Sequence, residues 1–207
     1  MEFDFVHDTQ RLFRKILTAA SFPGRVVDLG QEAAKIETGS AVNTALIGCA
    51  IALLDAEATF CVWPRGGQEQ ERLISQLTYG RPAAPESAEF LFVLSGSGIA
   101  NDALRSASVG TLEEPHRGAT LFIEVSGLRE ESAIREEGVR RGTGVLRIEG
   151  PGVKDSAMLG VEGLDADWLG ARAERCSEYP LGVDVYLVDG AGRLAGIPRT
   201  ARLTEGG

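Results

Sequence analysis

Residues 183–197, VDVYLVDGAGRLAGI, contain two strand-like runs on either side of the turn Asp189-Gly190-Ala191-Gly192. A four-residue turn rich in glycine between two such runs predicts a β-hairpin over 183–188 and 193–197. The first run carries apolar side chains at both its odd and its even positions. We therefore expect one face of this hairpin to pack in the core and the other against a helix or another chain.

The rest of the chain alternates between helical and strand-like segments. We expect helices over 8–20, 42–54, 68–78, 100–106 and 165–176, and strands over 26–29, 59–63, 90–94, 119–125 and 145–149. This alternation predicts a layered α/β fold, and the terminal hairpin requires its sheet to be mixed. The length of 207 residues and the lack of an internal repeat predict a single domain over 1–207.

The first predicted helix is the clearest local signal. Asp8 or Thr9 is the expected N-cap, and the residues 21–24, SFPG, end the helix through proline and glycine. Spacings of i, i+3, i+4 and i+7 predict one apolar face made of Phe13, Ile16, Leu17 and Ala20.

Charge and composition narrow the function classes. The chain has 21 basic and 30 acidic residues, a formal net charge of −9. This negative net charge argues against a protein that binds nucleic acid or an anionic membrane through non-specific electrostatic attraction. The longest apolar stretch, 45–54, is about half of the roughly 20 residues that a membrane helix needs. The first residues carry acids where a signal peptide is basic, and Cys49, Cys61 and Cys176 form no even framework, so we expect a cytoplasmic protein with reduced thiols.

Motifs for nucleotide or covalent chemistry are weak. No G-x-x-x-x-G-K-[ST] or G-x-S-x-G occurs, and four G-x-G pairs stand where about three are expected by chance. The best placed, Gly96-Ser97-Gly98, follows a predicted strand, but Asn101 replaces the third glycine of a dinucleotide loop. The two histidines, His7 and His116, make a histidine-rich metal site improbable, and we expect no metal.

A pyridoxal phosphate enzyme needs a Schiff-base lysine, and the chain has three lysines. We place Lys15 on the surface of the first helix and Lys35 in a polar connection. Only Lys154, after the turn 150–153, is placed to project into a cleft. No bound cofactor is expected.

Arginine outnumbers lysine by 18 to three, and its planar fork suits both bound anions and interface ion pairs. Arg14 and Arg199 stand out because each lies among apolar residues. Either is a candidate for a salt bridge, an interface contact or a contact to an anion. The charged tract 129–144 is interpreted as a peripheral solvated loop or hairpin tip, with partner docking as the alternative.

Several blocks taken together resemble a known family. They are HDTQRLFRKIL and ASFPG (7–17 and 20–24), the segment 110–121, GPG (150–152), YPLGVD (179–184) and AGIPRT (195–200). In this order they look like the PhnH family, subunits of the bacterial carbon–phosphorus lyase machinery. The resemblance runs from about residue 5 to residue 203.

The resemblance implies a three-layer sandwich similar to pyridoxal-phosphate-dependent transferases but without the cofactor. It also implies a homodimer within a core assembly containing PhnG, PhnI and PhnJ. With its nucleosidase-type subunit, that core attaches an alkylphosphonate to C1 of the ribose of ATP. We therefore expect a non-catalytic subunit and assign no catalytic residue. The alternative is a stand-alone α/β protein that binds a phosphate- or phosphonate-bearing molecule through arginines such as Arg14 and Arg199.

Overall fold

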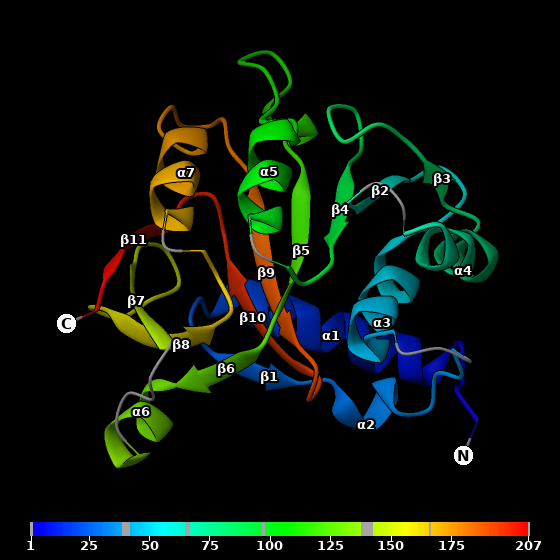
Figure 1. The fold of residues 1–207 in the computed structure, drawn as a ribbon, viewed down its shortest axis with the longest axis horizontal. Helices are drawn as coiled ribbons and strands as arrows, with labels where there is room; N and C mark the ends of the chain where they lie inside the picture. Colours follow the sequence, from blue (N-terminus) through cyan, green and yellow to red (C-terminus); the bar gives the residue numbers. More distant parts are fainter. Residues whose placement is uncertain are drawn as a thin grey trace.

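The computed structural model describes residues 2–38, 42–64, 67–96, 98–137, 143–165 and 167–206. Within these ranges the chain forms a seven-stranded mixed sheet and a second, four-stranded antiparallel sheet (Figure 1). The larger sheet has the order β1-β10-β9-β5-β4-β2-β3. Its strands are β1 (Val26–Asp28), β2 (Thr59–Trp63), β3 (Arg81–Pro82), β4 (Phe90–Val93), β5 (Thr120–Val125), β9 (Asp184–Asp189) and β10 (Arg193–Ile197).

The predicted hairpin is the point where the sheet changes direction. Strands β3, β2, β4, β5 and β9 are parallel, whereas β10 runs antiparallel to both β9 and β1. In the hairpin Leu194 pairs with Val188 and Ile197 pairs with Val185. The predictions of a hairpin over this segment and of a mixed sheet are confirmed.

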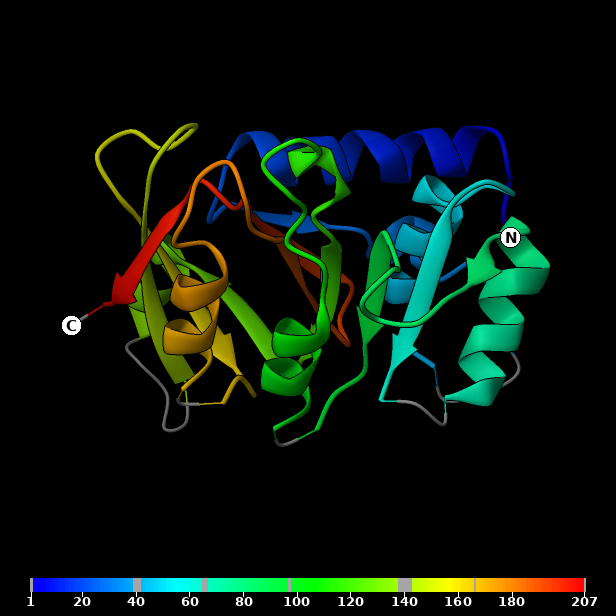
Figure 2. The same ribbon diagram turned by 90° about the horizontal axis from the view of Figure 1, so that it is seen from above.

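Helices cover both faces of the larger sheet (Figures 1 and 2). One face carries α1 (His7–Ser21), α2 (Gly30–Ala33), α3 (Thr44–Leu53) and α4 (Gln68–Thr78), whose buried side chains join one apolar cluster. The other face carries α5 (Ile99–Ser106) and α7 (Trp168–Arg175), which belong to a second cluster. Because β9 contributes Val188 to the first cluster and Val185 and Leu187 to the second, its two apolar faces are both covered within the chain.

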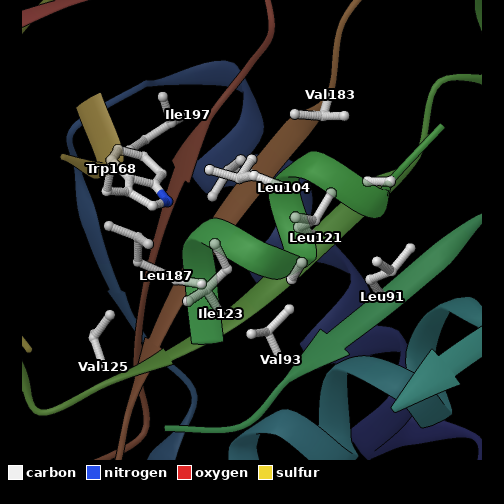
Figure 3. Packing of buried hydrophobic residues seen from close by; sticks show 14 of the residues in the cluster. Leu91, Val93, Leu104, Leu121, Ile123, Val125, Trp168, Val183, Leu187 and Ile197 are labelled. Carbon is white, nitrogen blue, oxygen red and sulfur yellow. The ribbon is translucent and has the colours of Figure 1, made fainter. Parts of the chain in front are cut away.

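The second sheet packs into the same cluster as α5 and α7. Its order is β11 (Arg202–Glu205), β7 (Thr143–Glu149), β8 (Ala157–Glu162) and β6 (Gly127–Glu130), and β6 follows β5 after a single residue. Leu128, Ile148 and Leu159 from this sheet are buried with the side chains of β5 and β9. Figure 3 shows Trp168 of α7 pointing toward Leu104 and Leu187 in that cluster.

The charged tract 129–144 is largely regular structure where it is described. It contains the end of β6, α6 (Glu131–Glu137) and the start of β7, while residues 138–142 lie outside the described residues. An i, i+4 ion pair between Glu131 and Arg135 supports α6. In its described part the tract therefore forms two strand ends and a helix, where a solvated loop or hairpin tip was expected. The helix 115–117 (Pro115–Arg117) is a single 3₁₀ turn before β5.

Helix α1 is present as predicted, but its orientation and its cap differ. The side chains turned to the core are Leu12, Ile16 and Ala19, whereas Phe13 and Leu17 are exposed. The expected N-cap at Asp8 or Thr9 is wrong. The Asp4 carboxylate accepts hydrogen bonds from the N–H groups of Val6 and His7 at 2.8 and 2.9 Å, and Asp8 is buried against Lys35. The helix has more apolar positions than the sheet covers, so periodicity alone did not fix which of them face inward.

Candidate functional site

An open apolar groove runs between α1 and the amino-terminal ends of three parallel strands. Its volume is about 300 Å³. One wall comes from α1, and the other wall and the floor come from the first residues of β4, β5 and β9 and from the segment after β10. The lining includes Phe13, Leu17, Ala20, Leu53, Phe90, Tyr186, Ile197 and Pro198.

The floor of the groove is the end of a row of aromatic rings across the sheet. Tyr186 stacks on Phe122 with 4.8 Å between ring centroids, and Phe122 stacks on Phe92 at 5.5 Å. Phe92 in turn meets the edge of Phe60 at 6.3 Å. Burial, followed by the nearby acidic groups of Asp184 and Cys49, raises the pKa of Tyr186 to about 12. The floor is therefore a packed aromatic surface whose phenol stays protonated at neutral pH.

Arg199 lies beside the groove and is held by groups of its own chain. Its backbone N–H donates to Oδ1 of Asp184 at 2.8 Å, and its Nε and Nη2 donate to Oδ2 at 3.0 and 2.6 Å. Nη1 and Nη2 also donate to the carbonyl oxygens of Pro115 and Gly118, at 2.9 and 3.3 Å. Arg199 thus joins the start of β9, the turn before β5 and the segment after β10, and its charge is matched by Asp184.

Arg172 fixes the same segment from the opposite side and was missed in the sequence. This buried side chain on α7 donates to the carbonyl oxygens of Pro198 and Ala201 at 2.7 and 3.1 Å. Burial lowers the pKa of its guanidinium, an effect that Cys176 and Asp184 oppose. Its i, i+4 spacing from Trp168, the largest apolar residue of the predicted helix 165–176, was the available signal.

Glycines let the segments around Arg199 approach closely. A Cβ at Gly118 would lie 2.4 Å from the carbonyl oxygen of Gly182 and 2.6 Å from Nη1 of Arg199. A Cβ at Gly152 would lie 2.6 Å from the carbonyl oxygen of Ser21, and Gly152 has a φ of +84°. The blocks 110–121, 179–184 and 195–200 therefore meet at Arg199. The block 150–152 meets the end of α1 at Ser21, and the N–H of Gly24 donates to the carbonyl oxygen of Gly196 at 3.4 Å.

Arg14, the other arginine singled out in the sequence, lies on the exposed side of α1. It lies three residues before Leu17 and neighbours it on the helix surface, whereas the side chain of Phe13, the preceding residue, points about 100° away around the helix. The carbonyl oxygen of Arg14 accepts a hydrogen bond from the Thr18 hydroxyl at 2.9 Å. Across the ranges that the structure describes, the Arg14 guanidinium makes no ion pair or hydrogen bond, and Arg199 does not contact it. The two arginines are therefore placed differently, one paired within the fold and one facing outward.

Two of the three lysines are bound to buried carboxylates. Lys35 donates to both oxygens of Asp8 at 2.8 and 3.0 Å, and Lys15 contacts Glu32. The hydrogen bond from Lys35, with that from the Asp4 N–H, lowers the pKa of Asp8. Lys15 was expected on the surface of the first helix; it lies there partly exposed and pairs with Glu32 of α2. Lys154 is exposed at the turn before β8 and borders an open hollow next to Phe22 and Arg25.

The turn at Gly96 and Gly98 is bonded to acidic groups through Gly98 and the nearby Asn101. The N–H of Gly98 donates to Oδ1 of Asp165 at 2.8 Å, and Nδ2 of Asn101 donates to Oδ1 of Asp167 at 2.6 Å. A phosphate group at this turn would meet two carboxylates, which weighs against a phosphate-binding loop. Ser97 lies outside the described residues.

The described residues contain neither a metal-binding cluster nor a membrane-spanning helix. Among the described residues no set of three or more His, Cys, Asp or Glu side chains is grouped to hold a metal ion. None of the helices described is both long and apolar enough to span a bilayer. His7 contacts the Asp4 carboxylate at 2.9 Å, and His116 lies in the 3₁₀ turn.

Comparison with known proteins gives two results. Residues 3–204 match the family model described as bacterial phosphonate metabolism protein (PhnH). The chain is also similar to a protein of Stutzerimonas stutzeri described as putative C-P lyase subunit protein HtxG. The two are 34% identical over 196 residues, which cover 94% of this chain and 85% of that relative.

Proposed function

This chain belongs to the PhnH family, and we propose that it is a non-catalytic subunit of the carbon–phosphorus lyase core complex, α-D-ribose 1-methylphosphonate 5-triphosphate synthase, in organic phosphonate catabolism. The description of its Stutzerimonas relative as a C-P lyase subunit supports this role.

The structural observation that carries the proposal is the groove between α1 and the strand ends. Phe13 and Leu17 on its rim are exposed although α1 packs on the sheet with its other side. An apolar groove lined by residues of several family blocks fits a surface that a partner covers. In this proposal the chain contributes surfaces that bind partner subunits, and the catalytic groups belong to those other subunits.

The proposed oligomeric state, partner subunits and fold similarity rest on membership of the PhnH family. We propose a homodimer that associates with PhnG, PhnI and PhnJ in the cytoplasm and contacts neither nucleic acid nor membrane. We also propose that residues 1–207 form one domain, a three-layer sandwich similar to pyridoxal-phosphate-dependent transferases and without that cofactor. The helices on both faces of the mixed sheet support the layered part. A preparation that turns yellow on incubation with pyridoxal phosphate would contradict the cofactor statement.

The alternative, a stand-alone protein that binds phosphate or phosphonate through Arg14 and Arg199, has less support. Asp184 and two carbonyl oxygens already engage the Arg199 guanidinium. Arg199 is therefore proposed as a structural contact near an interface, and Arg14 as an interface contact.

Co-expression tests the proposed function. This chain, carrying the sole affinity tag, is produced with PhnG, PhnI and PhnJ from the same genome and purified. Recovery of the sister subunits in fixed proportion is expected. Recovery of this chain alone, with the other subunits in the flow-through, would refute membership of the complex.

A further inference from the structure

The exposed side of α1 carries apolar side chains along its length. Val6, Phe13 and Leu17 are 74%, 41% and 48% exposed. Phe13 and Leu17 line the groove over Tyr186, and Arg14 lies three residues before Leu17 on the helix surface. These three residues and Val6 are here called the α1 face. A helix that packs on the sheet with one side and presents a second apolar side to solvent is typical of an interface.

The charge of the α1 face is positive, although the whole chain carries −9. Asp8 and Glu32, which pair with lysines of α1 and its surroundings, are buried, and the exposed Asp4 is bound to His7 at the start of the helix. Arg11 is turned back toward Asp8 at 3.4 Å. In the described part of the chain this leaves Arg14 as a cation without a carboxylate, at the edge of the apolar surface beside Leu17.

The position of Arg14 argues against a second copy of this chain on the same face. Helix α1 runs from His7 to Ser21, so Arg14 is its central residue. A two-fold axis that packs α1 against α1 through the centre brings the two Arg14 side chains together, because such an interface is self-complementary. Like charges at a desolvated contact disfavour association.

We infer that the α1 face docks an acidic amphipathic helix from a sister subunit, an inference that rests on the proposed function. Apolar side chains of that helix, spaced by three or four residues, enter the groove above Tyr186, and an Asp or Glu pairs with Arg14. A groove of about 300 Å³ is at the small end of ligand pockets and suits inserted side chains. The homodimer then uses another surface.

Substitutions on the α1 face test this inference in the co-expressed complex. Arg14→Glu reverses the charge, Arg14→Lys keeps it, and Leu17→Asp places a charge at the groove. Arg105→Glu makes the same charge change at an exposed site on α5, on the opposite face of the sheet, and is the matched control. Circular dichroism checks folding, and light scattering measures the oligomeric state of the chain alone.

We expect Arg14→Glu and Leu17→Asp to lower recovery of the sister subunits about tenfold or more. Arg14→Lys and Arg105→Glu retain recovery, and the homodimer stays intact in all variants. If Leu17→Asp does not fold, the recovery of the sister subunits with Arg14→Glu is the measurement that tests the inference.

Unchanged recovery with Arg14→Glu would overturn the inference while leaving the proposed function standing. Loss of the homodimer with full recovery of the sister subunits would overturn it in favour of a second copy. Failure of the unsubstituted chain to recover any sister subunit would refute the proposed function itself, and the inference with it.

Discussion

Asp184 and Arg199 form an ion pair of 2.6 Å that ties the first residue of β9 to the segment following β10. The pair is mostly shielded from solvent, and three donors of Arg199 converge on one carboxylate. The two ends of the hairpin are thereby closed on each other beside the groove. Because the guanidinium also bonds two carbonyl oxygens of another loop, one side chain holds three segments in place.

Arg199→Lys should destabilise the fold although it keeps the charge. A lysine ammonium lacks the planar fork that reaches Asp184 and both carbonyl oxygens, so buried acceptors lose partners. We expect a loss of roughly 1–3 kcal/mol in the free energy of unfolding, measured by urea denaturation. Arg14→Lys is the control and should stay within about 0.5 kcal/mol of wild type. Equal stability of both variants would contradict the structural role of Arg199.

Gly118→Ala should also be destabilising. The added methyl group would lie 2.4 Å from the carbonyl oxygen of Gly182, so backbone must move. The expected cost is roughly 1–3 kcal/mol by chemical denaturation. Gly170→Ala in α7 is the matched control, since its Cβ meets nothing within 4 Å. That substitution should stabilise the protein by up to about 1 kcal/mol through helix propensity. A neutral Gly118→Ala would disprove the close approach.

The buried carboxylate of Asp8 predicts a stability that depends on acid pH. Lys35 lowers the pKa of Asp8 in the folded chain, so the ionised form stabilises folding above the ordinary carboxyl pKa of about 4. This contribution is lost as the pH falls from about 4 through the lower folded value. Asp8→Asn should therefore be less stable than wild type at neutral pH, and the difference should shrink below pH 4. Thermal unfolding across that range measures it.

Glu149→Gln, at an exposed position of β7, serves as the control for removing one carboxylate. It should leave the midpoint of unfolding near that of wild type at neutral pH. A constant difference between Asp8→Asn and wild type at every pH would rule out the ionic contribution of the Lys35 contact.

Tyr186 predicts an alkaline titration at the floor of the groove. Its folded pKa of about 12 lies above the ordinary tyrosine value of about 10, so its neutral form stabilises the fold. That contribution is complete below pH 10 and is lost as the pH rises toward 12. Absorbance after a rapid pH jump should show a tyrosinate forming near pH 12 that is missing in Tyr186→Phe. If the tyrosinate that Tyr186→Phe lacks forms near pH 10 instead, Tyr186 is not shielded from solvent in the fold.

Calorimetry separates the proposed function from its alternative. The isolated chain titrated with ATP or methylphosphonate should give no binding heat up to millimolar ligand, because Asp184 occupies Arg199. Saturable binding that is lost in Arg14→Ala would instead favour an anion site on α1. Arg105→Ala, which removes an exposed arginine on α5, is the matched control for Arg14→Ala.

Much of the architecture can be predicted from local patterns in the sequence. The hairpin over 183–197, helix α1 and the parallel strands β2, β4 and β5 follow from turn chemistry and from residue spacing, which act over a few residues. The mixed sheet followed from the hairpin alone. Arg14 and Arg199 could be singled out because a charge within an apolar run is visible in the sequence.

The sequence alone established these elements and the family blocks, because each of them depends only on residues close together in the chain. Only the folded chain decided which side of α1 is buried, and that Lys35 reaches Asp8 and Lys15 reaches Glu32. It also decided the sheet containing β6, β8 and β11, which no local pattern indicated. The physical reason is that each of these depends on partners distant in sequence, whose contacts are chosen by packing and charge neutralisation in three dimensions.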